Sequence, residues 1–291
     1  MPDTDAERPS YILLFSCEDR RGIVAAVSGA LAENGLFILD SQQYADLETG
    51  RFFMRVVFTS DTDEARGMTH LRAMAEPIAD RFGWDWTLTE AGDKPRAVVA
   101  VSRNQHCLND LLHRQRIGAL GMRIAAVVSN HETCREIAEF HEVPFHHLPV
   151  TRDTRAEQEA AVEAIMQDAG APYLILARYM QVLSDEFSGR LTGRCINIHH
   201  GFLPAFKGAL PYHQAHTRGV KLIGATAHFV TADLDEGPII EQAVERVDHR
   251  LSAEELAAIG KDIEAQVLAR AVDWVGRRRV LLNRQRTIVF R

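Results

Sequence analysis

Three side chains of this 291-residue sequence have the types and spacing that suit catalysis, namely Asn197, His199 and Asp235. Asn197 lies in the apolar run 195–198, and His199 follows two positions later. If the run is a strand, alternate side chains leave it on one face, so the amide and the imidazole project together. Asp235 sits in a polar turn after the strand-like run 223–230. We therefore expect an amide, an imidazole and a carboxylate to converge on one cleft.

The chemistry open to these groups is acyl transfer. An amide can donate a hydrogen bond to a developing oxyanion. An imidazole can accept or deliver a proton near neutral pH, and a carboxylate can orient it, support its charge or hold an attacking water. The sequence has no serine in a Gly-x-Ser-x-Gly setting, so a covalent acyl-enzyme is not indicated. The set predicts direct attack on a small carbonyl by water or by an amine.

The elements that must position these groups form an α/β pattern from residue 96 onward. Apolar runs typical of buried strands alternate with segments of helical periodicity. We expect strands at 97–101, 123–129, 144–149, 173–177 and 194–198, helices at 106–116, 132–141, 155–168 and 253–277, and a closing hairpin over 280–282 and 287–290. This alternation predicts a doubly wound, mostly parallel sheet that binds ligands at the carboxyl ends of its strands.

The first part of the chain predicts a separate, smaller domain. After a polar tail we expect strands at 11–17, 37–44, 51–59 and 84–89, and helices at 23–33 and 64–82. Their order, βαββαβ, is the ferredoxin-like arrangement. Small and polar residues before and including Pro95 indicate a linker. The expected division is a tail over 1–9, a domain over 10–90, a linker over 91–95 and a domain over 96–291.

A set of motifs surrounds the three side chains, namely Asn197-Ile-His199, Leu203-Pro204, Gly224-Ala-Thr226-x-His228-Phe229-Val230 and Leu234-Asp235-x-Gly237-Pro238. These motifs resemble the folate-dependent formyltransferase family. A longer set resembles the deformylase branch of that family, namely His199-His200-x-Phe-Leu-Pro-Ala-Phe-x-Gly208-Ala, Pro211-Tyr-His-Gln-Ala and Arg218-Gly-Val-Lys221. Two departures lie on the loop after His199 and bear on acceptor choice: Gly201 replaces a common serine, and Leu210 a common polar residue.

The resemblance implies an enzyme that hydrolyses 10-formyltetrahydrofolate to formate and tetrahydrofolate, supplying formate for purine synthesis and balancing the one-carbon pool. The folate is then a substrate, and no cofactor is expected. The family's catalytic positions fall on Asn197, His199 and Asp235, and its pterin-binding positions fall on Met180, Gln181, Val182 and Leu183. No metal is expected, because His199 and Asp235 have a proton-transfer role in the family. His228 is expected to point into the core.

The loop over residues 102–110 bears on the acceptor of the formyl group. Relatives that act on a nucleotide have glycines here, which let backbone amides approach a phosphate, whereas this loop has none. Water is therefore the favoured acceptor, and His106 is expected to line the cleft. Two alternatives stay open. One is formyl transfer to an amine, such as a purine precursor or an amino sugar. The other is an amino-acid-sensing protein with a retired catalytic domain.

The N-terminal motifs form a second group, namely Cys17-x-Asp19-Arg20-x-Gly22-Ile23-Val24, Asn34-Gly35, Asp40-x-Gln42-Gln43 and Phe52-Phe53-Met54-Arg55. They resemble an ACT domain, which implies either dimer formation alone or an amino-acid regulatory site. Backbone N–H groups after Gly22 can bind a carboxylate, while Asp19 and Asn34 can hold an ammonium group. Glycine or methionine is the expected effector. Because such a sheet leaves an edge uncovered, we expect a homo-oligomer formed through residues 10–90.

Composition excludes several classes of partner. With 40 acidic against 33 basic residues the net charge is −7, so no general attraction to nucleic acid or anionic membrane is expected. No apolar run is long enough to cross a membrane, and the polar start over 1–9 lacks a leader's apolar stretch. The four cysteines are scattered, without metal-ligand spacing. We therefore expect a cytoplasmic protein whose ligands are the folate, water and an amino-acid effector.

Overall fold

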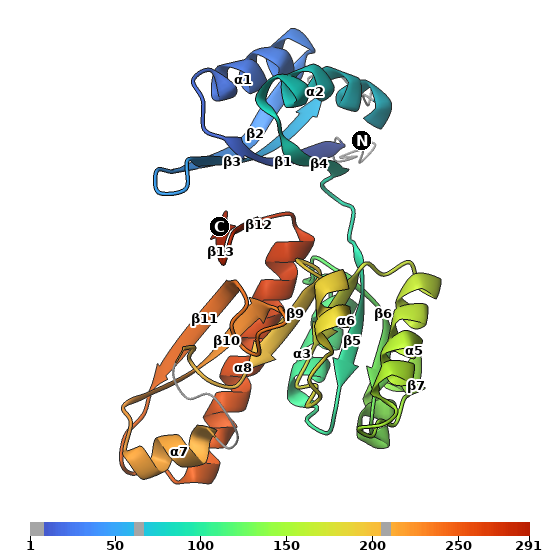
Figure 1. Ribbon diagram of the computed structural model, residues 1–291, viewed down its shortest axis with the longest axis vertical. Helices are drawn as coiled ribbons and strands as arrows, with labels where there is room; N and C mark the ends of the chain where they lie inside the picture. The colour runs from blue at the N-terminus through green and yellow to red at the C-terminus, as the bar shows by residue number, and fades with distance from the viewer. Residues whose placement is uncertain (1–8, 61–66, 205–210) are drawn as a thin grey trace, which may run out of the picture. The chain divides into compact units, whose positions relative to one another are not determined.

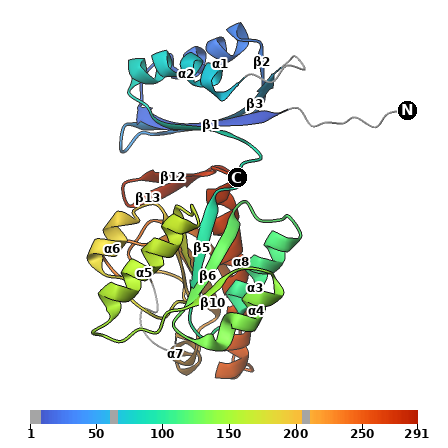
Figure 2. The same cartoon turned by 90° about the vertical axis from the view of Figure 1, so that its right-hand side faces the viewer.

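The computed structural model describes residues 9–60, 67–204 and 211–291. The chain divides into two compact units, which are taken separately below (Figures 1 and 2). One unit comprises Met1–Asp93 together with Ile288–Arg291, and the other comprises Lys94–Thr287. Within the described ranges, no helix is both long enough and apolar enough to cross a membrane.

The N-terminal unit is a four-stranded antiparallel sheet with both of its described helices on one face (Figure 2). Its elements are β1 (Ser10–Glu18), α1 (Ile23–Glu33), β2 (Leu36–Asp46), β3 (Arg51–Ser60), α2 (Met68–Phe82) and β4 (Asp85–Glu90), in strand order β2-β3-β1-β4. The predicted βαββαβ order is confirmed. The expected start of the second helix, near residue 64, lies outside the described residues.

Alternation along β1 builds the core under the two helices. Tyr11, Leu13 and Phe15 leave β1 on the same face and pack in one cluster with α1 and α2. The first helix contributes apolar residues four positions apart, Ile23, Val27 and Leu31, each at most 2% exposed. Burial of each large apolar side chain contributes roughly 1.5–3 kcal/mol, so this cluster fixes both helices on the sheet.

The C-terminal unit contains a seven-stranded sheet in the order β11-β10-β9-β8-β5-β6-β7. The strands are β5 (Arg96–Val101), β6 (Arg123–Ser129), β7 (Phe145–His147), β8 (Tyr173–Leu176), β9 (Cys195–His199), β10 (Leu222–Phe229) and β11 (Ile239–Arg246). Neighbours among β5 to β9 are parallel, while β10 runs antiparallel to both β9 and β11. The predicted doubly wound, mostly parallel sheet is confirmed.

The helices of this unit cover both faces of the sheet (Figure 1). They are α3 (His106–Arg116), α4 (Arg135–Phe140), α5 (Arg155–Asp168), α6 (Asp185–Arg190), α7 (Pro211–Arg218) and α8 (Ala253–Gly276). The central strand β5 explains the layering, because Val99 and Val101 pack with α3 and α8 whereas Val98 and Ala100 pack with α5 and α6. The sequence of a strand that is buried on both faces is a continuous apolar run, and β5 is apolar from Ala97 to Val101.

Several elements differ from the sequence expectation. The helix expected over 132–141 is a 3₁₀ turn, η1 (Glu132–Cys134), followed by α4. The elements α6, α7 and β11 were not expected; the two helices have only six and eight residues, too few for a clear period. The expected closing hairpin is present as β12 (Val280–Asn283) and β13 (Arg286–Val289).

The long helix α8 has a well-defined start that matters for the site. The Ser252 hydroxyl accepts a hydrogen bond from the Glu255 amide at 3.2 Å, and the Glu255 carboxylate accepts one from the Ser252 amide at 2.7 Å. This capping box satisfies two amides at the helix start. The helix then packs against α3 and β10 and carries the buried Glu264 in its middle.

Candidate active site

Strand β9 presents Asn197 and His199 at its carboxyl end. Its antiparallel pairing with β10 places Asn197 opposite His228 and His199 opposite Thr226. The Thr226 hydroxyl donates to the carbonyl of Gly201 at 2.9 Å. The loop that follows His199 is therefore tied to the neighbouring strand where it leaves the sheet.

A second wall of the site comes from the point where the sheet reverses its winding, between β5 and β8. Ligands of doubly wound sheets bind at such a switch point. The loops after the two strands are joined, because the Met180 amide donates to the Ser102 hydroxyl oxygen at 3.0 Å. The Ser102 hydroxyl in turn donates to Asn130 Oδ1 at 2.8 Å. This pairing fixes the start of the segment 180–183.

Asp235 reaches the site from the turn after β10. Its Oδ2 lies 3.2 Å from His199 Nδ1, and its Oδ1 lies 3.6 Å from His228 Nε2. The turn lies so close to β10 that a Cβ at Gly237 would be 1.7 Å from the Phe229 carbonyl oxygen. Asp235 itself has a φ of 57°, in the left-handed region. Non-glycine residues in this region are uncommon and concentrate at functional sites.

The charges around His199 follow from these contacts. Burial alone would raise the pKa of Asp235, but its interactions with the His199 and His228 imidazoles outweigh burial and hold that pKa well below its usual range. The His200 ring stacks on His199 with centroids 5.2 Å apart. Burial, reinforced by the charge of Arg178, lowers the pKa of His200 to about 4. At neutral pH, His199 therefore has an anion beside it and a neutral imidazole stacked on it.

The hydrogen bonds also indicate which nitrogen of each imidazole is protonated. His228 Nδ1 donates to the Phe229 carbonyl at 2.9 Å, so its Nε2 accepts from Asn197 Nδ2 at 3.1 Å. His199 Nδ1 faces the Asp235 carboxylate, and its Nε2 is buried without a hydrogen-bond partner among the described residues. His199 thus keeps one free basic nitrogen, and Asn197 keeps a second amide N–H.

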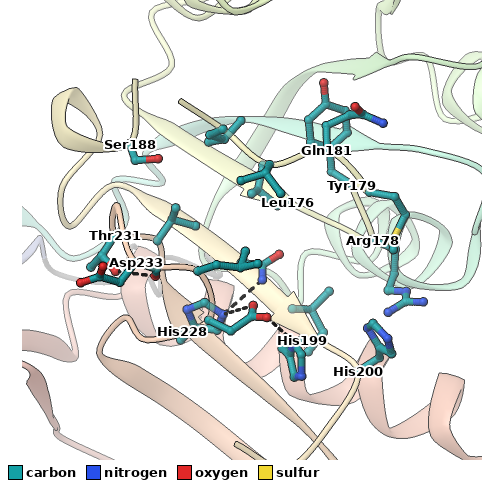
Figure 3. A pocket seen from close by; sticks show the side chains of 18 of the residues that line it. Leu176, Arg178, Tyr179, Gln181, Ser188, His199, His200, His228, Thr231 and Asp233 are labelled. Atoms are coloured by element: carbon teal, nitrogen blue, oxygen red, sulfur yellow. Dashed lines mark hydrogen bonds and ion pairs between the residues drawn. The ribbon is translucent and has the colours of Figure 1, made fainter. Parts of the chain in front are cut away.

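One cavity of ≈ 560 Å³ joins the two walls (Figure 3). This volume is typical of a site for a small organic ligand. The cavity is lined by all three expected catalytic residues and by the whole expected pterin segment, Met180, Gln181, Val182 and Leu183. Met180 and Val182 are 56% and 53% exposed, so part of this wall is apolar surface left open to a ligand.

His106 is not among the described residues that line this cavity. Its Nε2 lies 2.8 Å from Oε2 of Glu264, and Glu264 pairs with Arg178, which does line the cavity. His106 is therefore separated from the ligand space by Glu264 and Arg178, and direct contact with the substrate stays a prediction. Leu210, the second departure from the family motif, lies outside the described residues.

A group of three possible metal donors surrounds His106. Ligand atoms of His106, Cys107 and Glu264 lie within 4.8 Å of one another. Burial raises the pKa of the Cys107 thiol well above its usual value, which disfavours the thiolate that a metal needs. Glu264 already has Tyr212, His106 and Arg178 as partners. The geometry suits a buried ionic network better than a metal, and the expected absence of a metal stays a prediction.

The residues expected to bind an effector lie at the two ends of α1. Gly22 is the N-cap, with a φ of 93°, and Asp19 precedes it. Asn34 is the C-cap, and its Nδ2 donates to the Ala30 carbonyl at 2.8 Å. The 11 helical residues between the caps span about 16 Å. One small ligand therefore does not reach both ends within a single chain.

His228 has a role that the sequence expectation missed. It is buried, at 2% exposure, as expected, but it lines the cavity and hydrogen-bonds Asn197 instead of serving only the core. The register of β10 against β9 brings the two residues together. Arg178, His200 and Tyr212 also line the cavity and were not expected there. Each of the latter three follows a strand or a loop, where periodicity gives no signal.

Comparisons with known proteins agree with this site. Residues 95–272 match the formyl transferase family model, and residues 11–76 match that of the ACT domain. The formyltetrahydrofolate deformylase of Bacillus subtilis (strain 168) is 48% identical, over 96% of this chain and 93% of the relative. That of Corynebacterium sp. (strain P-1) is 44% identical, over 98% of this chain and 100% of the relative.

Solved structures separate the two branches of the fold. The formyltetrahydrofolate deformylase from Burkholderia mallei ATCC 23344 has a TM-score of 0.93 at 50% identity, covering 97% of this chain and 100% of that one. Glycinamide ribonucleotide transformylase 1 from Symbiobacterium toebii has a TM-score of 0.65 at 30% identity and covers only 70% of this chain, with 98% of its own. Full-length similarity is found with the deformylases, and this chain belongs to the formyltetrahydrofolate deformylase family.

Proposed function

We propose that this protein hydrolyses 10-formyltetrahydrofolate to formate and tetrahydrofolate. The observation that carries the proposal is a single cavity in which an amide, a paired imidazole and an ionised carboxylate meet an apolar wall. The folate is a substrate that leaves after each turnover. In the cell this reaction supplies formate for purine synthesis and balances the one-carbon pool.

Activation of water falls to His199 and Asp235. The free Nε2 of His199 accepts a proton from water as the water oxygen attacks the formyl carbon. The imidazole becomes a cation, which the Asp235 carboxylate stabilises through Nδ1 at 3.2 Å. Because its pKa is held far below neutrality, Asp235 stays anionic throughout and does not take the proton itself.

Collapse of the tetrahedral intermediate uses Asn197 and the same imidazole. The Asn197 amide has one N–H engaged with His228, and its second N–H is available to stabilise the oxyanion. The proton on His199 Nε2 then passes to N10 of the folate as the bond between N10 and the formyl carbon breaks. Formic acid and tetrahydrofolate result, and the second water proton is released to solvent when formic acid ionises to formate.

The folate ring system is assigned to the apolar half of the cavity. Met180, Val182 and Leu234 line it and are each more than half exposed in the free protein. Covering such surface with a flat ring contributes about 25 cal/mol per Å² of apolar area removed from water. Unused backbone groups of the segment 180–183 can hydrogen-bond the edge of a pterin, as expected from the family resemblance.

The test is release of formate from 10-formyltetrahydrofolate with no amine present. We expect the same rate with and without glycinamide ribonucleotide, since water is the acceptor. Strict dependence on that amine would assign the protein to formyl transfer. Absence of any turnover, together with retained binding of an amino acid, would instead support a retired catalytic domain.

We also propose that the ACT unit forms a homo-oligomer and binds an amino-acid effector, glycine or methionine. The support is the edge strand β2, which exposes Phe37, Leu39 and Tyr44 by 60%, 54% and 46%. Since Gly22 and Asn34 lie at opposite ends of α1, a ligand that uses both needs a second chain. A cytoplasmic location completes the proposal, because all four cysteines are free and buried.

A further inference from the structure

A buried carboxylate that the proposed mechanism does not use lies next to the cavity. Glu264 is 1% exposed; its Oε1 accepts from the Tyr212 hydroxyl at 2.6 Å, and its Oε2 lies 2.8 Å from His106 Nε2. Arg178 Nε is 3.3 Å from Oε2, but its N–H is not directed for a hydrogen bond, so this is a contact between charges. A buried anion is costly unless it is paired in this way, and Glu264 is fully engaged by its three partners.

Two of these partners, Arg178 and Tyr212, face the cavity, and His200 lies between His199 and Tyr212. The His200 ring centroid is 5.2 Å from that of His199 and 6.5 Å from that of Tyr212. Figure 3 shows Arg178 and His200 on the side of His199 opposite to His228. We call Arg178, His200 and Tyr212 the acceptor wall.

The acceptor wall is built in a fixed position. A Cβ at Gly260 would lie 2.1 Å from the Tyr212 ring, so the ring rests directly on α8 one turn before Glu264. Arg178 is held at a φ of 61°, in the left-handed region. Such a conformation persists only where surrounding contacts enforce it, and here the pairing with Glu264 is such a contact.

The wall lies where a nucleophile must approach. The folate is assigned to the apolar part of the cavity. His228, the hydrogen-bond partner of Asn197, lies on one side of His199, and Arg178 and His200 of the acceptor wall lie on the other (Figure 3). A formyl carbon placed between Asn197 and His199 is therefore attacked from the acceptor-wall side. This step rests on the proposed function.

We infer that the acceptor wall selects water over amines as the nucleophile. The His200 ring occupies the side of His199 that faces Tyr212, and Arg178 adds a positive charge held by Glu264. The carboxylate that could bind an ammonium group on this side, Glu264, is already occupied by Tyr212, His106 and Arg178. Glu264 and His106 thus act as positioning residues for the wall.

Water and an amine compete for attack on the same formyl carbon, and each reaction can be written out in full. With water, an O–C bond forms, the C–N10 bond breaks, one water proton reaches N10 and the other is released to solvent, giving formate. With hydroxylamine, an N–C bond forms, the C–N10 bond breaks and a proton from the attacking nitrogen reaches N10, giving formohydroxamic acid. The ratio of formohydroxamate to formate therefore measures nucleophile choice, separately from the total rate.

The experiment uses the full-length protein, 10-formyltetrahydrofolate and excess hydroxylamine, and quantifies both products. Tyr212→Ala opens the wall, and Arg178→Gly removes its charge while suiting the left-handed backbone. Each variant is expected to raise the product ratio about tenfold or more, the usual size of discrimination by a pocket of this kind. Gln181→Ala, on the folate side of the same cavity, is the matched control and should leave the ratio at the wild-type value.

If one of the variants Tyr212→Ala and Arg178→Gly does not fold, the other alone still tests whether the acceptor wall selects water. An unchanged ratio in a variant that still releases formate would overturn the acceptor wall while leaving hydrolysis intact. A wild-type ratio already as high as that of the variants would also overturn it. If wild-type protein consumes no 10-formyltetrahydrofolate, the proposed function fails first and the inference that rests on it fails too.

Discussion

The two units differ in how close together they place the residues expected to bind a ligand. In the C-terminal unit, Asn197 and His199 come from the end of β9 and Asp235 from the turn after β10, and the three meet in one cavity within a single chain. In the N-terminal unit, Gly22 and Asn34 cap the two ends of one helix, about 16 Å apart. A site that needs both of them is incomplete in one copy of the chain.

This difference has a physical origin in the two folds. A doubly wound sheet gathers the carboxyl ends of its strands at one edge, so residues far apart in sequence converge without help from another chain. A ferredoxin-like sheet with helices on one face leaves its edge strands uncovered, and it gains a second surface by pairing. Catalysis is thus expected to depend on single side chains, and regulation on assembly.

The largest expected effect comes from removing charge at the catalytic site. Asp235→Asn should lower kcat by about 10³- to 10⁴-fold, because the amide cannot support the imidazolium or fix the His199 tautomer. Asp233→Asn in the same turn is the control, and it should cost far less. Steady-state formate release measures both. Comparable losses in the two variants would show that the turn, and not the Asp235 charge, is what matters.

Breaking the proposed β2 interface should abolish assembly and regulation together. Leu39→Asp places a charge on the exposed edge strand, so the mass in solution should fall to that of one 32.6 kDa chain, and any response to glycine or methionine should vanish. Leu47→Asp is a matched control, being apolar, 90% exposed and in the turn beyond β2. Light scattering and formate release report the two properties. A Leu39→Asp oligomer with its effector response intact would exclude this edge.

Paired glycine substitutions compare the packing of the two units. Gly260→Ala should lower the free energy of unfolding by about 1–3 kcal/mol, since its Cβ would collide with Tyr212. Gly29→Ala in α1 meets nothing within 4 Å, and it should be neutral or stabilise by up to about 1 kcal/mol. Calorimetric unfolding of both variants tests this. Equal changes in the free energy of unfolding for Gly260→Ala and Gly29→Ala would mean that the Tyr212 ring does not pack against α8.

A smaller effect concerns pH and the buried imidazole His200. Its pKa is lowered from 6.5 to about 4 in the folded protein, so between these values the unfolded chain binds more protons. Stability should therefore rise with pH across this window and fall as the pH drops from 6.5 towards 4. His200→Gln should show a flatter dependence. Urea midpoints at pH 7 and pH 4.5 measure it, and parallel curves for the two proteins would refute the assignment.

The sequence allowed some of these features to be predicted for clear reasons. The i, i+2 spacing of Asn197 and His199 needs only the period of a strand. The approach of the Asp235 turn depends in addition on the antiparallel pairing of β10 with β9. The separation of Gly22 from Asn34 was also derivable, since 11 helical residues have a fixed length.

Other features depend on information that local patterns do not contain. His228 meets Asn197 only through the register of β10 against β9, and alternation alone does not fix a register. His106 meets Glu264 across 158 positions of sequence, through the packing of α3 on α8. Buried polar networks of this kind arise from tertiary packing, so no window of sequence indicates them.

The central claim is that His199 is the group that moves protons during hydrolysis of 10-formyltetrahydrofolate. The most direct test is formate release by His199→Ala compared with wild-type protein, at saturating substrate and without any amine. We expect wild-type protein to release formate steadily and the variant to lose at least about 10³-fold in rate, with folding unchanged by circular dichroism. Near-normal formate release by folded His199→Ala would contradict the account.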